Sequence, residues 1–250
     1  MFAWRKRIGH ISPGSLSTSV YDFYLVAPEG VGLIGISNPI NDWRQEEYER
    51  ALENVVNAAQ YLAARHVHFI NHAGAPPVAS RGPDFVRRIK QEIEEKTGLP
   101  ASTAIYSASE ALRSLNAKNI VVLTPFPPKS HEQVVSVISA MGFNVVAEAR
   151  MDANFNDLYL IGEREVYDFV TKAIARAPKA DAGYVPCPQW HVFELARYLE
   201  GDTGLPLVTS DSGDFWYAFK TLGIRDVKPG YGILLDRLRA TDKTESGKTP

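Results

Sequence analysis

The chain has 250 residues, 45% of them hydrophobic and 22% charged, and a formal net charge of −2. A chain of this length and apolar content folds around one large core or two smaller ones, which excludes a disordered protein. The near-neutral charge argues against a general electrostatic grip on nucleic acid or anionic lipid. The single cysteine, Cys187, excludes an intrachain disulfide framework and is compatible with a reducing compartment.

The apolar runs are short. The longest span only four or five residues, against the roughly 20 that a membrane-spanning helix needs. The basic N-terminal residues are not followed by an apolar stretch of signal-peptide length. We therefore expect a soluble cytoplasmic protein without membrane or nucleic-acid partners, and we predict that residues 239–250 form a flexible tail.

The first half of the chain alternates short β-branched runs with amphipathic stretches. In the stretch from Glu46 to Arg65, apolar residues recur at steps of three and four and form one stripe, as in a helix packed on a core. Gly98 and Pro100 end a second helix. The pattern predicts strands at 7–12, 31–36 and 67–71 and helices at 46–65, 84–96 and around Leu112 and Leu115.

The second half repeats this alternation. The pattern predicts strands at 120–124, 145–148, 182–186 and 207–210 and helices at 132–141, 164–177, 191–200 and 213–222. Strands that alternate with helices indicate an α/β fold with mostly parallel sheets covered by helices. No Gly-rich GxGxxG or Walker-type loop follows any predicted strand, so the sequence does not indicate a nucleotide cofactor.

A four-residue sequence occurs twice. Thr-Gly-Leu-Pro stands at 97–100 and again at 203–206, each time after a strand and a helix and before a short extended stretch and another helix. This repeat predicts two pseudo-symmetric α/β domains, the first made of 1–115 plus about 211–238 and the second of 116–210. Gly74 and Cys187 then lie at equivalent strand ends, where ligands bind in open α/β sheets. We expect the active site in the cleft between the domains, with a thiol from one side only.

Cys187 is the main candidate for chemistry. It follows a predicted strand and precedes a predicted helix, a position where a helix N-terminus favours the thiolate. His191, four residues on, would lie one helical turn away and could share a proton with it. The alternatives are a buried structural thiol and an ordinary surface or core histidine. The sequence has no HExxH motif and only one cysteine, so it indicates no metal site.

Seven segments, in this order and spacing, resemble the aspartate/glutamate racemase superfamily, in the branch that holds arylmalonate decarboxylase and maleate cis-trans isomerase. The resemblance covers the chain from Arg7 to about Leu238. The matching segments are 7–13, 74–82, 97–100, 122–126, the strand that runs into Cys187, 204–206 with Ser210, and 228–232.

The resemblance implies a cofactor-free enzyme with its active site between two pseudo-symmetric domains. Racemases of this superfamily use two cysteines on opposite faces of the substrate carbon, and maleate isomerases also keep two. In this chain the first position is Gly74 and the second is Cys187. That pattern is similar to arylmalonate decarboxylase, in which loss of CO₂ generates an enediolate and a lone cysteine protonates one face of it. By this resemblance Cys187 is the general acid, acting on a small carboxylate.

Five residues depart from the decarboxylase pattern. Ala75 and Pro76 stand where hydroxyl side chains hold the enediolate, Phe126 replaces a tyrosine, and Pro188 and Gln189 replace two glycines. Loss of one such donor typically costs about 100- to 1000-fold in rate. Groups that could substitute include Tyr48, which matches a family tyrosine, and several other polar side chains. The predicted substrate-binding set is Pro13, Ser15, Tyr48, His72, Gly74, Ala75, Pro76, Phe126, Pro188, Gln189, His191 and Ser210.

The prediction is therefore a cofactor-independent enzyme acting at the carbon α to a carboxylate, most like an arylmalonate-type decarboxylase. Three alternatives stay open. One is a maleate isomerase-like or racemase-like enzyme, and another is a lyase or hydrolase with Cys187 as nucleophile and His191 or His72 as base. The third is a non-catalytic small-ligand binder. The sequence does not decide whether the chain forms a homo-oligomer, and Tyr48 and His72 also have purely structural interpretations as core groups.

Overall fold

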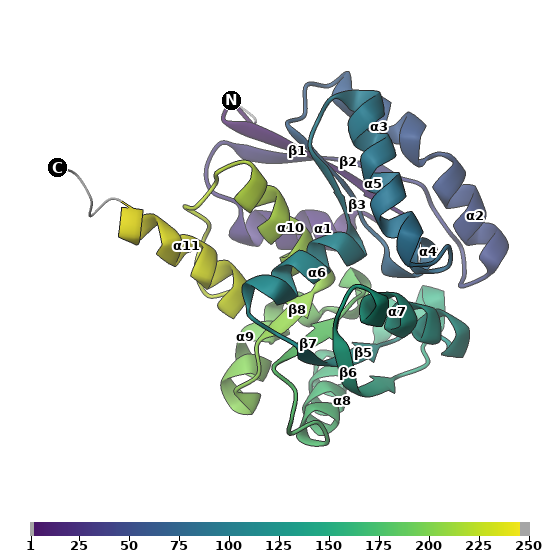
Figure 1. Cartoon of the computed structure of the whole chain (residues 1–250), viewed down its shortest axis with the longest axis vertical. Helices are drawn as coiled ribbons and strands as arrows, with labels where there is room; N and C mark the ends of the chain where they lie inside the picture. Colours follow the sequence, from purple (N-terminus) through teal and green to yellow (C-terminus); the bar gives the residue numbers. More distant parts are fainter. Residues whose placement is uncertain (1–2, 246–250) are drawn as a thin grey trace.

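Two four-stranded parallel sheets organise the chain in the computed structural model, which describes residues 3–245 and their side chains as far as Arg239. Figure 1 shows one sheet in the upper half of the molecule and the other in the lower half. The first sheet holds β1 (Lys6–Ser12), β2 (Val31–Ser37), β3 (Phe69–His72) and β4 (Ala101–Thr103). The second holds β5 (Asn119–Thr124), β6 (Asn144–Arg150), β7 (Ala182–Val185) and β8 (Leu207–Thr209).

The helices cover both sheets and join them. The first half contains α1 (Ser17–Val26), α2 (Gln45–Glu53), α3 (Val55–Ala63), α4 (Ala75–Ala79), α5 (Pro83–Thr97) and α6 (Ala104–Ser114). The second half contains α7 (Pro128–Ala140), α8 (Glu163–Ala175), α9 (Val192–Thr203), α10 (Ser210–Thr221) and α11 (Ile233–Glu245), with short 3₁₀ helices η1 (Phe155–Leu160) and η2 (Pro188–Trp190). Of the described residues, none belongs to a helix long and apolar enough to cross a membrane.

The two sheets have the same topology. Their strand orders are β2-β1-β3-β4 and β6-β5-β7-β8, so each strand of the first sheet has a counterpart four strands later. Strands β3, β4, β7 and β8 are buried along their whole length, as strands of a helix-covered parallel sheet are, whereas the edge strand β6 is only partly buried. The predicted α/β fold with two similar, mostly parallel units is confirmed.

The repeated Thr-Gly-Leu-Pro turns explain how the duplication is built. Thr97 Oγ1 donates to the Ile93 carbonyl at 2.7 Å, and Thr203 Oγ1 donates to the Leu199 carbonyl at 2.6 Å. The following glycines both take the left-handed conformation, with φ of 68° at Gly98 and 67° at Gly204. A side chain at either position would be strained there, so glycine ends both helices. Each turn leads its chain directly into the last strand of its sheet.

Several elements differ from the prediction. The single helix expected at 46–65 is two helices, α2 and α3, because Asn54 leaves the helical conformation and donates a side-chain hydrogen bond to Asn38 Oδ1 at 3.1 Å. The sequence did not reveal α1, because its buried face carries polar residues that hide the apolar stripe. Helix α11 continues to Glu245, into the segment 239–250 expected to be a tail, and 246–250 lie outside the described residues.

Helix α10 joins the two halves. It follows β8 of the second sheet but packs on α1, α6, β3 and β4 of the first half. Its first residue, Ser210, lies beside the end of β7, where Ser210 Oγ accepts the Cys187 backbone N–H at 2.9 Å. The domain boundaries at 1–115, 116–210 and about 211–238 stay a prediction, to which this packing lends support.

Candidate active site

A pocket lies where the carboxyl ends of the two sheets face each other. Both halves of the chain contribute to its wall, and its cavity of about 40 Å³ is room for only a few water molecules. Ligands bind at this edge in open α/β sheets. The lining residues are Ser12, Pro13, Gly14, Ser15, Ile40, Trp43, Ala73, Gly74, Ala75, Pro76, Pro77, Phe126, Phe155, Cys187, Pro188, Gln189 and Ser210.

Gly74 and Cys187 occupy twin positions in this pocket. Gly74 follows β3 with φ 96° and ψ 95°, and Cys187 follows β7 with φ 109° and ψ 101°. Each precedes a short helix with a proline in its first turn. A side chain with φ near 100° is strained by roughly 1–3 kcal/mol, and such strain concentrates at functional sites. The strained cysteine therefore marks the place where the two halves differ chemically.

The Cys187 thiol is buried, with 7% of the residue exposed. Burial raises its pKa to about 12, opposed by the backbone amides of Gln189 and Trp190, which face the sulfur and lower it. The Cys187 backbone N–H donates to Ser210 Oγ at 2.9 Å and so ties the loop to α10. A thiol with this pKa is protonated at neutral pH, which suits a proton donor better than a standing thiolate nucleophile.

The Gly74 side of the pocket is closed by Pro13. A Cβ atom built on Gly74 would lie 2.4 Å from Pro13 Cγ and 2.8 Å from Pro13 Cδ, far inside contact distance. The ring of Pro13 thus occupies the space into which a side chain at position 74 would extend. A second thiol opposite Cys187 has no room here.

Aromatic rings form the outer wall. The Trp43 ring, from the segment between β2 and α2, meets Phe126 edge-on at 5.2 Å between centroids and Phe155 at 4.8 Å. Its Nε1–H donates to the Ala153 carbonyl at 3.1 Å. Since Trp43 belongs to the first half and its three partners to the second, this side chain bridges the two halves and narrows the pocket.

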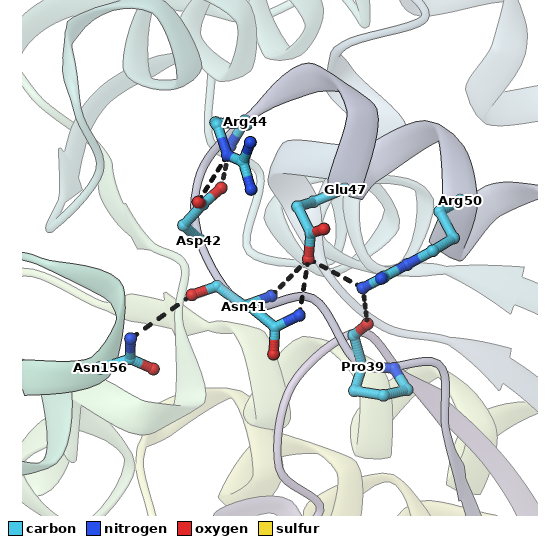
Figure 2. Close-up of polar contacts among 7 residues, drawn as sticks. All are labelled: Pro39, Asn41, Asp42, Arg44, Glu47, Arg50 and Asn156. Atoms are coloured by element: carbon cyan, nitrogen blue, oxygen red, sulfur yellow. Dashed lines mark hydrogen bonds and ion pairs between the residues drawn. The ribbon is translucent and has the colours of Figure 1, made fainter.

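Polar contacts hold the Trp43 segment in place, as Figure 2 shows. Glu47 Oε2 accepts the Asn41 backbone N–H at 2.7 Å and one Arg50 N–H at 2.8 Å, and the same Arg50 nitrogen donates to the Pro39 carbonyl at 2.8 Å. Across the cleft, Asn156 Nδ2 reaches the Asn41 carbonyl at 3.5 Å. The bonds from Glu47 and Arg50 hold this loop against α2. The bond from Asn156 of the second half is longer, and therefore weaker.

Comparison with known proteins gives a consistent result. The family model described as arylmalonate decarboxylase matches residues 20–235. The chain belongs to the arylmalonate decarboxylase family. The arylmalonate decarboxylase of Bordetella bronchiseptica is 24% identical over 203 residues, which cover 76% of this chain and 80% of that protein.

Solved structures agree with the fold. A glycine-to-cysteine, cysteine-to-serine double mutant of arylmalonate decarboxylase in its liganded form superimposes with a TM-score of 0.87 at 20% identity, covering 93% of this chain and 99% of the other. A cysteine-to-serine mutant of Nocardia farcinica maleate cis-trans isomerase with a covalently bound succinylcysteine intermediate gives 0.83 at 19% identity, covering 93% and 98%.

Ten of the thirteen residues that the sequence singled out line the pocket of this arylmalonate decarboxylase family member. They are Pro13, Ser15, Gly74, Ala75, Pro76, Phe126, Cys187, Pro188, Gln189 and Ser210. Their roles toward a substrate stay a prediction.

Three of the thirteen lie elsewhere. Tyr48 is buried, and its hydroxyl bonds Ser130 Oγ at 2.9 Å. His72 lies under the pocket floor, where burial lowers its pKa to about 4. His191 adopts φ 53° at the junction of η2 and α9, so the segment from Cys187 to His191 is a short 3₁₀ turn and not a turn of α-helix. A proton shared between Cys187 and His191 stays a prediction.

Sequence reasoning missed the aromatic wall. Trp43 lies in the loop before α2 and Phe155 begins the 3₁₀ helix η1, both without a motif, so only the folded chain brings Trp43 against Phe126 and Phe155. Ile40 and Pro77 also line the pocket without having been singled out. The one available signal was a tryptophan that follows the turn-forming run 38–42 and precedes a helix, because large aromatic side chains in loops often mark binding sites.

The pocket wall is unusually poor in charge. Its polar side chains are Ser12, Ser15, Gln189 and Ser210 beside the thiol, and the lining includes neither lysine nor arginine. Gln189 Nε2 donates to Tyr159 Oη at 3.1 Å, which fixes its amide at the pocket mouth. Neutral hydroxyl, amide and backbone donors are thus the groups that this site offers to an anion.

Proposed function

We propose that this enzyme is a cofactor-independent decarboxylase of small substituted malonates in which Cys187 protonates the α-carbon from one face. The observation that carries the proposal is the twin geometry of Gly74 and Cys187: one position holds a buried protonated thiol, and the other is a glycine closed off by Pro13. A site with a single proton donor delivers a proton to one face only.

The reaction balances with the groups of this site. The bond between the α-carbon and one carboxylate breaks, CO₂ leaves, and the electron pair remains on the α-carbon and the second carboxylate as an enediolate. The Cys187 S–H bond then breaks and its proton forms the new C–H bond, leaving a thiolate. The backbone amides of Gln189 and Trp190 face the sulfur and stabilise that thiolate.

The aromatic wall supports the bond-breaking step. A carboxylate loses its charge when it leaves as CO₂, so apolar surroundings raise the energy of the charged starting state more than that of the product. Trp43, Phe126 and Phe155 provide such a surface in the pocket wall. Ser15, Gln189 and Ser210 are the side chains positioned to hold the carboxylate that stays.

The size of the pocket indicates the substrate. Its volume of about 40 Å³ is well below the roughly 150 Å³ cavity that takes up a benzene ring in an engineered protein core. We infer a malonate with a compact α-substituent rather than a large aryl group. Ala75, Pro76 and Phe126 lack the hydroxyl groups that would donate hydrogen bonds to the enediolate. A small unsaturated substituent is therefore favoured, because it delocalises the negative charge within the substrate itself.

The other chemistries fit the site less well. The related isomerase was captured as a cysteine-to-serine mutant that still carries a succinylcysteine, whereas this chain has one cysteine in all. A nucleophilic lyase or hydrolase needs a thiolate, whereas burial raises the pKa of the Cys187 thiol to about 12, and no hydrogen bond joins that thiol to His72 or His191 within the described residues. A non-catalytic binder is the outcome if ligands stabilise the protein without turnover.

The deciding experiment incubates the enzyme with methyl-, vinyl- and phenylmalonate and with maleate in D₂O and follows the products by proton NMR. We expect CO₂ release and one deuterium at the α-carbon for the compact malonates, and a loss of at least about 100-fold in Cys187→Ser. Ser80→Ala, outside the pocket, is the matched control for handling and folding. Equal activity of Cys187→Ser and the native enzyme would remove the thiol from the mechanism, and conversion of maleate to fumarate would replace the proposal with isomerisation.

We further propose that the enzyme acts in the cytoplasm on a small carboxylate and without nucleic acid. A lone thiol needed in its reduced form is best maintained in a reducing compartment. The net charge of −2 gives no electrostatic reason for a polyanionic partner. Association into a homo-oligomer is an open question that sedimentation of the purified protein answers directly.

A further inference from the structure

The side-chain amide of Gln189 is a nitrogen donor that the pocket wall leaves partly unused. Only two side chains of the lining carry N–H groups, Trp43 and Gln189, and the single Trp43 N–H is donated to the Ala153 carbonyl. Gln189 is 8% exposed, and its amide makes one hydrogen bond within the described residues, from Nε2 to Tyr159 Oη at 3.1 Å. A primary amide has two N–H donors, so the second N–H is available to a ligand.

This amide is packed as well as bonded. A Cβ atom built on Gly14 would lie 3.0 Å from Gln189 Nε2 and 3.4 Å from both Cδ and Oε1, so the amide rests against the bare backbone of Gly14. That backbone is itself fixed, because the Gly14 N–H is donated to Ser12 Oγ at 3.2 Å and the Gly14 carbonyl accepts the Ser37 hydroxyl at 2.7 Å. Glycine at this position therefore leaves the room that the amide needs.

Tyr159 supplies the acceptor that orients the amide. It belongs to η1, and its ring packs on the His191 ring at the junction of η2 and α9, with 6.0 Å between the centroids. Tyr159 does not line the pocket, so a ligand there would not touch it. Because an amide group is planar, fixing one N–H at Tyr159 Oη also fixes the direction of the other. Without that acceptor, rotation about the last side-chain torsion would exchange the nitrogen and the oxygen.

The carboxylate that the substrate retains needs such a donor. In the proposed decarboxylation, negative charge grows on this group as the enediolate forms, and Ala75, Pro76 and Phe126 offer it no hydroxyl. Pro188 also lacks a backbone N–H. Gln189 stands where the resemblance places a glycine, so its amide is a polar group that this chain adds while other donors are lost.

We propose that the free N–H of Gln189 binds the carboxylate that the substrate retains, and that Tyr159 is the positioning residue that directs this N–H into the pocket. The inference rests on the proposed decarboxylation of a malonate. No covalent bond changes at Gln189: its N–H donates to a carboxylate oxygen, and this hydrogen bond strengthens as that oxygen takes up the enediolate charge. Since the bond is stronger in the transition state than in the bound substrate, its loss lowers kcat more than it raises KM.

A double-mutant cycle on vinylmalonate turnover tests the assignment. Gln189→Met keeps the length of the side chain without its donors and should lower kcat at least about 100-fold. Tyr159→Phe keeps the ring against His191 and should lower kcat about fivefold, with KM within about twofold of native. Added to Gln189→Met, Tyr159→Phe should change kcat less than about twofold, because it acts only through the amide. Tyr21→Phe is the matched control and should keep native kcat, since Tyr21 gives its hydrogen bond to Glu194 outside the pocket.

Two kinetic results would overturn the proposal. One is a kcat of Gln189→Met within about threefold of native, which would remove the amide from the transition state. The other is a further loss of about fivefold when Tyr159→Phe is added to Gln189→Met, because independent effects multiply and Tyr159 would then act by another route.

A measurement without turnover tests the donor by itself. The side-chain amide signals of Gln189 are assigned in a proton–nitrogen correlation spectrum by their loss in Gln189→Met. We expect these signals to shift on titration with propionate, the product of methylmalonate decarboxylation, and signals that stay in place would reject Gln189 as a carboxylate donor. If the native enzyme turns over no malonate, the proposed function fails, while a propionate-dependent shift would still support the Gln189 donor.

Discussion

Replacing Gly74 with cysteine tests the claim that Pro13 has taken the place of a second thiol. The new Cβ would lie 2.4 Å from Pro13 Cγ, which the backbone accommodates only by moving. Overpacking of this kind costs about 1–3 kcal/mol, and a side chain at φ 96° adds strain of similar size. For a chain of this length, in which each kcal/mol lowers Tm by about 2–4 °C, the combined cost of about 2–6 kcal/mol predicts that Gly74→Cys melts about 4–24 °C below the native enzyme.

The double variant isolates the clash. Pro13→Ala removes Cγ and Cδ but keeps the carbonyl that accepts the Ile40 N–H at 2.8 Å, so Pro13→Ala/Gly74→Cys should regain about 1–3 kcal/mol of unfolding free energy over Gly74→Cys. Urea unfolding monitored by circular dichroism measures all four proteins, with Pro13→Ala as control. If Gly74→Cys is as stable as the native enzyme, or if removing the proline ring restores nothing, Pro13 does not close that face.

Three further substitutions give distinct results. Tyr48→Phe removes the hydroxyl that bonds Ser130 Oγ and should lower Tm by about 3–6 °C. Because Tyr48 does not line the pocket, kcat and KM should stay within about twofold of native, and a large loss of kcat would place Tyr48 in the site. Trp43→Ala removes the bridge to Phe126 and Phe155 and should raise the turnover of phenylmalonate relative to methylmalonate at least about tenfold, while an unchanged ratio would dismiss Trp43 as a size filter. Because the pKa of Asp22 is raised to about 10, the folded state binds a proton there that the unfolded state has lost above about pH 4. Native stability should therefore fall relative to Asp22→Asn by up to about 1.4 kcal/mol per pH unit between pH 7 and 9, and parallel urea titrations would argue against a protonated Asp22.

Local sequence patterns were enough to predict the two similar α/β units and the strands that lead to the pocket. The Thr-Gly-Leu-Pro turns carry equivalent hydrogen bonds and left-handed glycines, so their repetition in sequence reports a repetition in space. The apolar periodicity located the strands that lead to Gly74 and Cys187, and the order of elements indicated that these strand ends face each other. Both depend on interactions within a few residues along the chain.

Features that depend on distant contacts were not predictable in this way. Helix α1 turns Ser19 and Asp22 inward because their partner, Asp211, arrives from a residue nearly two hundred positions later. His191 was expected to lie one helical turn from Cys187, but the short 3₁₀ helix η2 stands between the two residues. Trp43 becomes part of the pocket only when the two halves meet.

The most direct test of one-sided protonation uses an α-methyl-α-vinylmalonate in D₂O, whose product carries a stereocentre at the protonated carbon. Chiral separation and NMR then report both the enantiomer and the position of the deuterium. We expect one enantiomer with a single deuterium at the α-carbon, and no product from Cys187→Ser above the uncatalysed rate. A racemic product, or unimpaired turnover by Cys187→Ser, would contradict the assignment of the lone thiol as the proton donor.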